Sequence, residues 1–406
     1  MKAGVRVAVL GAGLQGSCLA MDLASTGFLV DLFDRNPACM TQASLHNEGK
    51  VHLGYVYGND PSLRSARAMV EGAATFGPLL ERWLEIPMSR LGRSAEFNYA
   101  VHRDSLLSPA DFEVHLRRTH EIVVGRIAPG DYFGLDLHQP PRRLRAPELE
   151  NDYDPQVVQT VHRTSEVSID PRVLAQTVRD RIAADHRITQ VLDTEVVGVG
   201  LADDRITVEF IDRGTPAVAD YEYVVNALWD GRLVVDASAG LVPPNPWLFR
   251  VKHFLMLQSA TARLPSTTIV LGPFGDIVDY GQGAFYLSWY PSGLQGSSSG
   301  LEVPESLRSL PGEASHEMRA GIVAGLASIT PRLLEVPVSD MDAAELSGGV
   351  IFAWGETDID DPSSGLHSRF ETGPMSVGRY HSVDTGKLTT APLFAQRVGD
   401  RLRAAQ

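Results

Sequence analysis

The first part of the chain alternates between short apolar runs and glycine-rich turns. Residues 5–10 are apolar except for Arg6, which is typical of a strand buried on both faces of a parallel sheet. A stretch of small residues and leucines follows and ends at Gly27, and a second apolar run spans residues 28–33. This pattern predicts a strand, a helix and a second strand, the first unit of a Rossmann-type α/β fold.

Similar patterns predict elements further along the chain. Strands are expected at 247–254 and within 269–290, where aromatic and apolar residues gather. Helices are expected at 171–182, 317–326 and 391–403. Asp170 and Ser315 suit the N-terminal caps of the first two helices. The Gly- and Ser-rich run 293–300 predicts a mobile loop.

Composition and charge narrow the classes of function. The chain has 406 residues, and its net charge of −14 argues against a nucleic-acid partner, because phosphate binding needs a basic surface. No apolar run reaches the roughly 18 residues of a membrane span. The two cysteines, Cys18 and Cys39, form neither a disulfide framework nor a metal-ligand spacing, so we expect no metal and a reducing, cytoplasmic setting.

The turn after the first predicted strand carries the spacing G-x-G-x-x-G. Gly11 permits the tight turn, Gly13 lets a pyrophosphate approach the backbone, and Gly16 lets the helix pack closely on the strand. The helix N-terminus offers free N–H groups to the phosphates. Asp34, at the end of the second strand, suits the hydroxyls of a ribose. The segment therefore predicts a dinucleotide site and leaves the choice between NAD and FAD open.

A polar, glycine-punctuated stretch follows where an NAD domain would place a third strand. It runs from Ala43 to Tyr55 and includes the sequence Val51-His52-Leu53-Gly54-Tyr55. Together with the N-terminal glycines, this stretch resembles the D-amino-acid oxidase and glycine oxidase superfamily of FAD-dependent oxidoreductases. The resemblance implies that FAD is the cofactor and that the stretch runs beneath the flavin.

The resemblance also implies an architecture. We expect an α/β fold with a Rossmann-type FAD-binding domain, similar to that of glutathione reductase. It would be interleaved with an α+β substrate domain built on an antiparallel sheet. The expected FAD-binding domain comprises residues 1–85, 155–240 and 345–406, and the substrate domain comprises 86–154 and 241–344.

Cofactor contacts follow from the glycine motif and from the resemblance. The resemblance places residues 195–199 near the adenine and residues 224–231 beside the dinucleotide. It also places the glycine loop at Gly386, with the helix after it, against the flavin pyrimidine ring. The expected cofactor-binding residues are Gly11, Gly13, Leu14, Gln15, Gly16, Asp34, Arg35, Ala43, Ser44, His46, Asn47, Gly49, Val196, Ala227, Trp229, Gly386, Lys387, Leu388 and Thr389.

Five residues are candidates for catalysis. His52 is either a base or a covalent attachment point near the flavin ring, or a hydrogen-bonded structural histidine. Lys387 either adds positive charge near the reduced flavin or is a solvated helix-start lysine. Tyr286 lines the pocket or packs in the core, and Arg379 and His381 precede the glycine loop, so at least one is expected in the substrate site.

One departure from the family pattern affects the substrate. Amino-acid oxidases of this family carry an arginine before the last strand that clamps the substrate carboxylate. The corresponding region, 348–358, has none, and Arg369 and Arg379 are the candidates to replace it. Arg250 and Lys252 share one face of a predicted strand, and we expect that face to be solvated.

These observations predict an enzyme that acts on a small molecule. We expect oxidation of a CH–NH bond of an amine or amino-acid derivative by hydride transfer to flavin N5, with O2 or another electron acceptor reoxidising the flavin. Three alternatives stay open: oxidation of the CH–OH group of a hydroxy acid, an NAD-dependent dehydrogenase, and a redox-inert flavin-binding protein.

Overall fold

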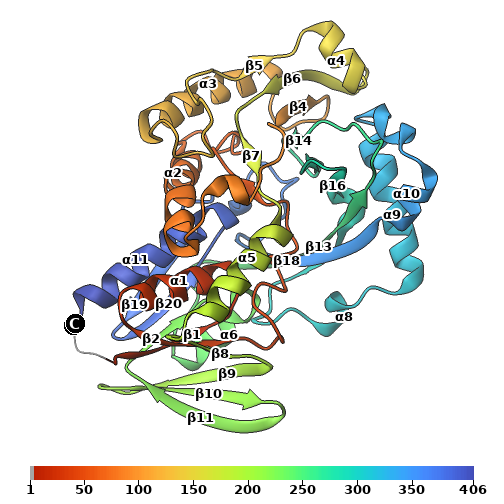
Figure 1. Cartoon of the computed structure of the whole chain (residues 1–406). Helices are drawn as coiled ribbons and strands as arrows, with labels where there is room; N and C mark the ends of the chain where they lie inside the picture. The colour runs from red at the N-terminus through yellow and green to blue at the C-terminus, as the bar shows by residue number, and fades with distance from the viewer. Residues whose placement is uncertain (1–3) are drawn as a thin grey trace.

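A six-stranded sheet carries the N-terminal glycine turn. The computed structural model describes residues 4–406, and its first sheet has the strand order β19-β20-β12-β1-β2-β8 (Figure 1). The five strands from β20 to β8 are parallel, and β19 runs antiparallel to β20. The strands are β1 (Arg6–Leu10), β2 (Leu29–Phe33), β8 (Ile188–Val191), β12 (Tyr223–Asn226), β19 (Gly373–Val377) and β20 (Tyr380–Asp384). The predicted strands at 5–10 and 28–33 are confirmed.

Helices cover this sheet and share its apolar core. They are α1 (Leu14–Ser25), α2 (Arg64–Leu84), α5 (Pro171–Ala184) and α11 (Ala391–Ala404). The side chain of Asp170 accepts a hydrogen bond from the Arg172 amide, which confirms the predicted cap of α5. Gly16 allows α1 to pack on β1, because a Cβ there would lie 1.9 Å from the carbonyl oxygen of Gly11.

A three-stranded antiparallel sheet flanks the first sheet. Its order is β11-β10-β9, and Figure 1 shows it beside the strands β1, β2 and β8. The strands are β9 (Thr194–Leu201), β10 (Ile206–Asp212) and β11 (Thr215–Tyr221), and the short helix α6 (Arg232–Ser238) packs on β9. The amide of Val199 donates to Ser238 Oγ at 2.8 Å, which ties β9 to α6.

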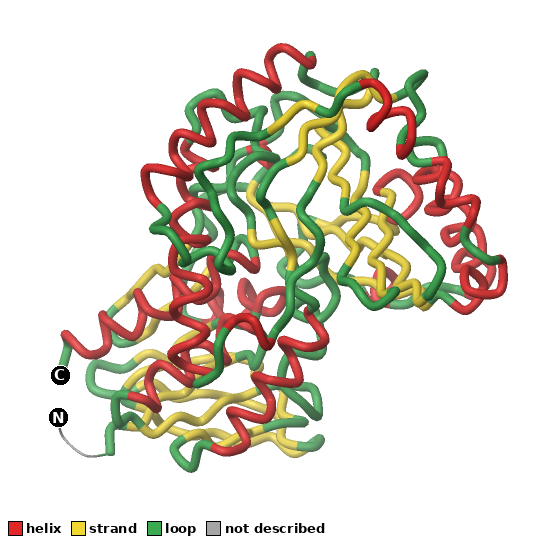
Figure 2. The backbone as a smooth tube through the Cα atoms, turned by 45° about the horizontal axis from the view of Figure 1, so that its top comes forward, coloured by secondary structure: helices red, strands yellow, loops and turns green. Residues whose placement is uncertain are grey.

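The second large sheet has nine strands and is antiparallel except where β4 pairs with β14. Figure 2 shows the two large sheets as separate strand layers in the two halves of the molecule, with helices on their outer sides. The strands are β4 (Asn98–His102), β5 (Arg142–Arg143), β6 (Val158–Arg163), β13 (Trp247–Gln258), β14 (Thr267–Val270), β15 (Gly275–Asp279), β16 (Ala284–Trp289), β17 (Leu294–Ser298) and β18 (Glu345–Trp354). This arrangement confirms the predicted fold class.

The remaining elements are short or lie around the second sheet. The helices are α3 (Pro109–Arg126), α4 (Ala146–Asp152), α7 (Tyr290–Gly293), α8 (Glu305–Arg308), α9 (Gly312–Ala327) and α10 (Val338–Ala343). The 3₁₀ turns are η1 (Met88–Arg90), η2 (Trp229–Gly231), η3 (Pro331–Glu335), η4 (Gly365–His367) and η5 (Leu388–Thr390), and β3 (Lys50–Val51) pairs with β7 (Val167–Ser168). Within residues 4–406 no helix is both long and apolar enough to cross a membrane.

Two local predictions are wrong. The expected loop 293–300 contains β17, whose backbone pairs with β13, because strand pairing outweighs the turn preference of Gly and Ser. The helix expected at 317–326, with Ser315 as its cap, instead begins at Gly312 after Pro311, so Ser315 lies inside it. The proposed domain boundaries stay a prediction, although β6 and β18, which fall in the segments expected for FAD binding, join the nine-stranded sheet.

Candidate active site

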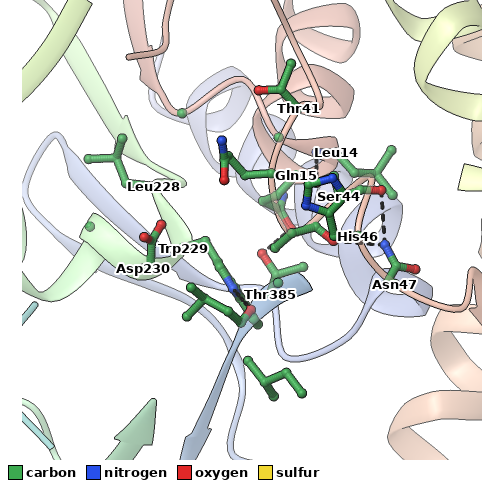
Figure 3. A pocket seen from close by; sticks show the side chains of 18 of the residues that line it. Leu14, Gln15, Thr41, Ser44, His46, Asn47, Leu228, Trp229, Asp230 and Thr385 are labelled. Atoms are coloured by element: carbon green, nitrogen blue, oxygen red, sulfur yellow. Dashed lines mark hydrogen bonds between the residues drawn. The ribbon is translucent and has the colours of Figure 1, made fainter. Parts of the chain in front are cut away.

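A cavity of about 900 Å³ is lined by residues of both large sheets. At one end lie the turns that follow β1, β2 and β12, together with part of β9. At the other end lie side chains of β13 and β16, strand β18 and the loop before η5. Figure 3 shows side chains from separate parts of the chain, among them Gln15, Ser44, Trp229 and Thr385, around this space.

The glycine turn leaves a gap in the cavity wall at Gly13. A Cβ at Gly11 would meet the carbonyl oxygen of Ala227 at 2.7 Å, so Gly11 serves close packing, as Gly16 does. A Cβ at Gly13 would meet only Ser44 Oγ, at 3.0 Å. The backbone at Gly13 therefore faces open space at the start of α1, where helix N–H groups favour an anion.

Asp34 stabilises the same turn from the end of β2. Its Oδ2 accepts the amide of Ala12 at 2.8 Å, and its Oδ1 accepts the amide of Asn36 at 2.9 Å. The Leu14 amide donates to Ser44 Oγ at 2.8 Å, which joins the turn to the 43–47 segment. Asp34 thus holds the shape of the turn and also lines the cavity.

The cavity brings together most of the residues predicted for the cofactor. Those that line it are Gly11, Gly13, Leu14, Gln15, Asp34, Arg35, Ala43, Ser44, His46, Asn47, Val196, Ala227, Trp229, Gly386, Lys387 and Leu388. Gly16, Gly49 and Thr389 lie behind its wall. Gly49 has φ +65°, and a Cβ there would lie 1.9 Å from the Ile169 carbonyl oxygen. Thr389 Oγ1 accepts the His52 amide at 2.9 Å, so both residues shape the wall.

Lysines from separate elements face the end of the cavity beyond the glycine turn. Lys50 lies 2.7 Å from Asp276 Oδ1, and Lys252 donates to Ser288 Oγ at 3.2 Å. Burial, together with nearby arginines, lowers the pKa of Lys387 to about 8, although Glu48 opposes the shift. These cations favour an anionic group in this part of the cavity.

His52 lies on the same wall between two carboxylates. Its Nδ1 is 3.7 Å from Glu166 Oε1, and its Nε2 is 3.9 Å from Glu48 Oε1. Burial lowers the pKa of His52 in spite of Glu166, so the ring is neutral near pH 7. Its Nδ1 and the hydroxyl of Tyr57 are buried and have no hydrogen-bond partner among residues 4–406.

Two buried arginines lie close to Lys387. Burial, with help from Arg250, lowers the pKa of Arg369 to about 10, and both arginines lower the pKa of Lys387. Arg250 is 2% exposed and donates to the Tyr290 hydroxyl at 2.8 Å and to Asp358 Oδ1 at 3.0 Å. The prediction that Arg250 and Lys252 form a solvated face is therefore wrong, because the segment after β18 covers Arg250.

Arg379 and His381 lie outside the cavity, contrary to the prediction. Arg379 is exposed, and its guanidinium lies 5.5 Å from the centre of the Tyr223 ring. His381 lies in β20, with its Nδ1 2.7 Å from Ser376 Oγ. Gly378, with φ +58°, forms the turn between β19 and β20, so the loop that reaches the cavity begins only at Thr385. Tyr286, His52 and Lys387 do line the cavity.

Several residues of the site were missed by sequence reasoning. Glu48 and Lys50 line the cavity, while Glu166 and Asp276 are their charged neighbours. Glu48 and Lys50 lie inside the 43–55 stretch, whose unusual polarity was the available signal. Glu166 lies in the loop between β6 and β7, and Asp276 lies in β15, so no local pattern marks their proximity.

The fold and this cavity define a dinucleotide-dependent oxidoreductase with two sheets around one site. The family model DAO, described as FAD dependent oxidoreductase, matches residues 6–343, and the chain belongs to this family. It is a flavin-dependent oxidase or dehydrogenase with FAD as its cofactor, and the NAD-dependent alternative is wrong. The open backbone at Gly13 and the two-sheet cavity fit this group.

Solved structures share the fold at low sequence identity. Glycine oxidase from Geobacillus kaustophilus superposes with a TM-score of 0.68 at 15% identity, over 99% of this chain and 95% of that chain. L-proline dehydrogenase from P. horikoshii gives 0.67 at 13% identity, over 100% and 95%. L-α-glycerophosphate oxidase from Mycoplasma pneumoniae gives 0.64 at 15% identity, over 98% and 94%. No curated protein sequence matches this chain significantly.

Proposed function

We propose that the protein oxidises the CH–NH bond of an amine that also carries a carboxylate, an amino-acid derivative. When bound, FAD accepts the hydrogen and the two electrons that leave the substrate carbon. The chain's own residues bind the acid group, orient the amine and manage its proton. The observation that carries this proposal is the buried guanidinium of Arg369 beside Arg250 and Lys387.

Arg369 has the properties of a carboxylate anchor. The residue is 7% exposed, and within residues 4–406 its guanidinium makes no hydrogen bond, while its backbone amide is held by Ser65 Oγ at 2.9 Å. Tyr57, whose buried hydroxyl also lacks a partner, interacts with it electrostatically. Asp384 also stabilises its charge electrostatically, but among residues 4–406 no carboxylate is hydrogen-bonded to the guanidinium, so an incoming carboxylate that accepts two N–H bonds is favoured.

His52 is suited to take the amine proton. A substrate ammonium must lose a proton before the neighbouring carbon can be oxidised. The neutral imidazole lines the cavity, and Glu166 beside Nδ1 and Glu48 beside Nε2 stabilise the positive charge that the ring would gain. We therefore assign His52 the role of base in the proposed reaction.

Relatives in the fold support an amine and leave one rival. The similar structures include a glycine oxidase and a proline dehydrogenase, and also a glycerophosphate oxidase, which favours a CH–OH substrate as the second candidate. His52 would serve an alcohol equally well.

Two free buried cysteines support the proposed cytoplasmic setting.

A substrate panel tests the proposal. Anaerobic mixing with N-methyl amino acids, small α-amino acids, the matching amines without a carboxylate, and 2-hydroxy acids is followed by loss of the flavin absorbance near 450 nm. We expect bleaching only by compounds with both an amine and a carboxylate. Bleaching by hydroxy acids alone would establish the rival, and bleaching by the plain amines would remove Arg369 from its role. Peroxide formed on adding air then identifies O2 as the acceptor.

A further inference from the structure

A short segment that follows β17 of the nine-stranded sheet lines the cavity near the glycine turn. In the segment 302–308, which we call the strap, the residues that line the cavity are Glu302, Val303, Pro304, Glu305 and Arg308. The strap connects β17 to α9 and contains α8, which lies apart from α9 and α10 on the side of β1 and β2 (Figure 1). No sequence pattern marked this segment as part of the dinucleotide site.

One carboxylate oxygen joins the strap to the first sheet. Asp230 Oδ2 lies 2.8 Å from a terminal guanidinium nitrogen of Arg308 and 3.0 Å from one of Arg35. Asp230 is 8% exposed and lies in η2, directly after β12. Trp229 before it has φ +58° and donates from Nε1 to the Val350 carbonyl oxygen at 2.8 Å, which fixes the turn against β18.

Charge makes Arg308 important for a dinucleotide. The acidic residues that line this end of the cavity are Asp34, Glu195, Asp230, Glu302 and Glu305, and the arginines that line it are Arg35 and Arg308. A pyrophosphate brings two more negative charges. Without Arg308, Asp230 would be balanced by Arg35 alone, and the cavity mouth would repel the phosphates.

The strap is attached to its own sheet at both ends and packs in an apolar cluster in its middle. Trp247 Nε1 donates to the Gly300 carbonyl oxygen at 2.9 Å, and Gln295 Nε2 donates to that of Ser309 at 2.6 Å. Between these anchors, Val303 and Leu307 pack in an apolar cluster that includes Leu233 of α6. The strap is therefore held to the first sheet's part of the chain by the Asp230–Arg308 ion pair and by this apolar cluster.

We infer that the strap closes over the bound dinucleotide and that Arg308 is a cofactor-retaining residue, positioned by Asp230. Arg308 of the strap and Arg35 both pair with Asp230 Oδ2, so these ion pairs hold the strap against the turn after β12. This inference depends on FAD binding and is independent of the substrate proposed above.

The rate of flavin release tests it directly. Diluted holoenzyme releases FAD, and the rise in flavin fluorescence gives the rate. We expect Arg308→Gln to release FAD about tenfold faster than the unmodified protein, since a charged contact is lost. Ser306→Ala, a change on the same short helix, should leave the rate unchanged. Asp230→Asn should also speed release, and the double variant should be no faster than the quicker single variant.

Proteolysis provides a second measurement that needs no variant. Trypsin cleaves after arginine, and FAD should protect the Arg308–Ser309 bond, whereas the exposed Arg213–Gly214 bond in the turn between β10 and β11 should be cut equally with and without FAD. An unchanged release rate in Arg308→Gln, or equal cleavage of both bonds in holoenzyme and flavin-stripped protein, would overturn the inference. Neither the flavin release rate nor the trypsin cleavage depends on turnover. If the substrate panel failed, the inference about Arg308 would therefore be unaffected.

Discussion

Arg369 and Lys387 are both buried cations, but their pKa values are lowered to different levels. Burial lowers the pKa of Arg369 to about 10, which keeps it charged at neutral pH. Burial lowers the pKa of Lys387 to about 8, close to the pH at which enzymes work. Arg369 therefore stays charged across the neutral range, whereas the charge on Lys387 depends on pH.

Replacement of Arg369 should lower kcat/KM for substrates that carry a carboxylate. Removing one partner of a buried charge pair costs about 2–5 kcal/mol, so we expect Arg369→Gln to lower kcat/KM for an amino acid by about 30-fold or more. The matched amine without a carboxylate should lose much less. Arg369→Lys keeps the charge without the bidentate fork and should fall between the two. A similar loss for both substrates would point to a folding defect, which the flavin content would reveal.

The charge on Lys387 should be visible in anion binding. Above pH 8 the ammonium group loses its proton, so the dissociation constant of acetate, which does not itself titrate there, should rise from about pH 8 upward. The perturbation of the flavin spectrum measures acetate binding. In Lys387→Gln, binding should be weaker and independent of pH between 7 and 9. A pH-dependent rise that persists in this variant would assign the titration to another group.

The lowered pKa of Lys387 also makes the stability of the folded protein depend on pH. Between pH 8 and the ordinary lysine value of 10.5, the folded protein binds fewer protons at Lys387 than the unfolded chain does. The free energy of unfolding contributed by this residue therefore rises with pH across that window. The Lys387→Gln variant should lack this rise in urea titrations.

At the scale of elements, the glycine turn separates packing from cofactor binding. Gly13 has φ −66°, which any residue adopts, and its missing Cβ leaves space that a ligand can use. We expect Gly13→Ala to fold normally and to bind FAD at least about tenfold more weakly, because the added methyl meets the dinucleotide. Gly16→Ala should instead cost about 2 kcal/mol of stability or more, since its Cβ would collide with the Gly11 carbonyl oxygen. Flavin absorbance and urea midpoints of the two variants measure both effects. Normal flavin content in Gly13→Ala would contradict the assignment.

The sequence predicted those elements that are determined by residues close together along the chain. The first strand, the glycine turn, α1 and the cap at Asp170 follow from residues within a few positions of one another. By contrast, β17 forms from a Gly- and Ser-rich run because β13 lies beside it, and Arg250 is buried because the segment carrying Asp358 covers it. Strand pairing and burial by distant segments cannot be recognised from the local sequence of β17 or around Arg250.

The same limit explains the errors in the site. His381 was placed near the flavin from its position in the chain, yet β20 is an interior strand and directs it to Ser376. Lys50 and Asp276 are 226 residues apart, so only the folded sheet brings them together. Residues close to the glycine motifs could be predicted, whereas Tyr286 is the one catalytic candidate of the second sheet that the sequence placed in the cavity.

At the scale of the whole molecule, FAD binding should couple the two large sheets. The cavity is lined by residues of both, and the Trp229 indole joins the turn after β12 to β18. A ligand that contacts both parts stabilises them together. The chain should therefore unfold in one transition when FAD is bound, and the largest apolar core favours the same result because it includes residues of both sheets, such as Val9 and Tyr286.

Thermal unfolding at increasing FAD concentrations tests this coupling. Free FAD at 100 times its dissociation constant adds about 2.7 kcal/mol to the stability of a protein that binds it only when folded. We expect a single calorimetric transition that moves upward with FAD, and a much smaller movement in Gly13→Ala. If the nine-stranded part instead unfolded in a separate transition that FAD did not move, the second sheet would contribute little to binding the cofactor.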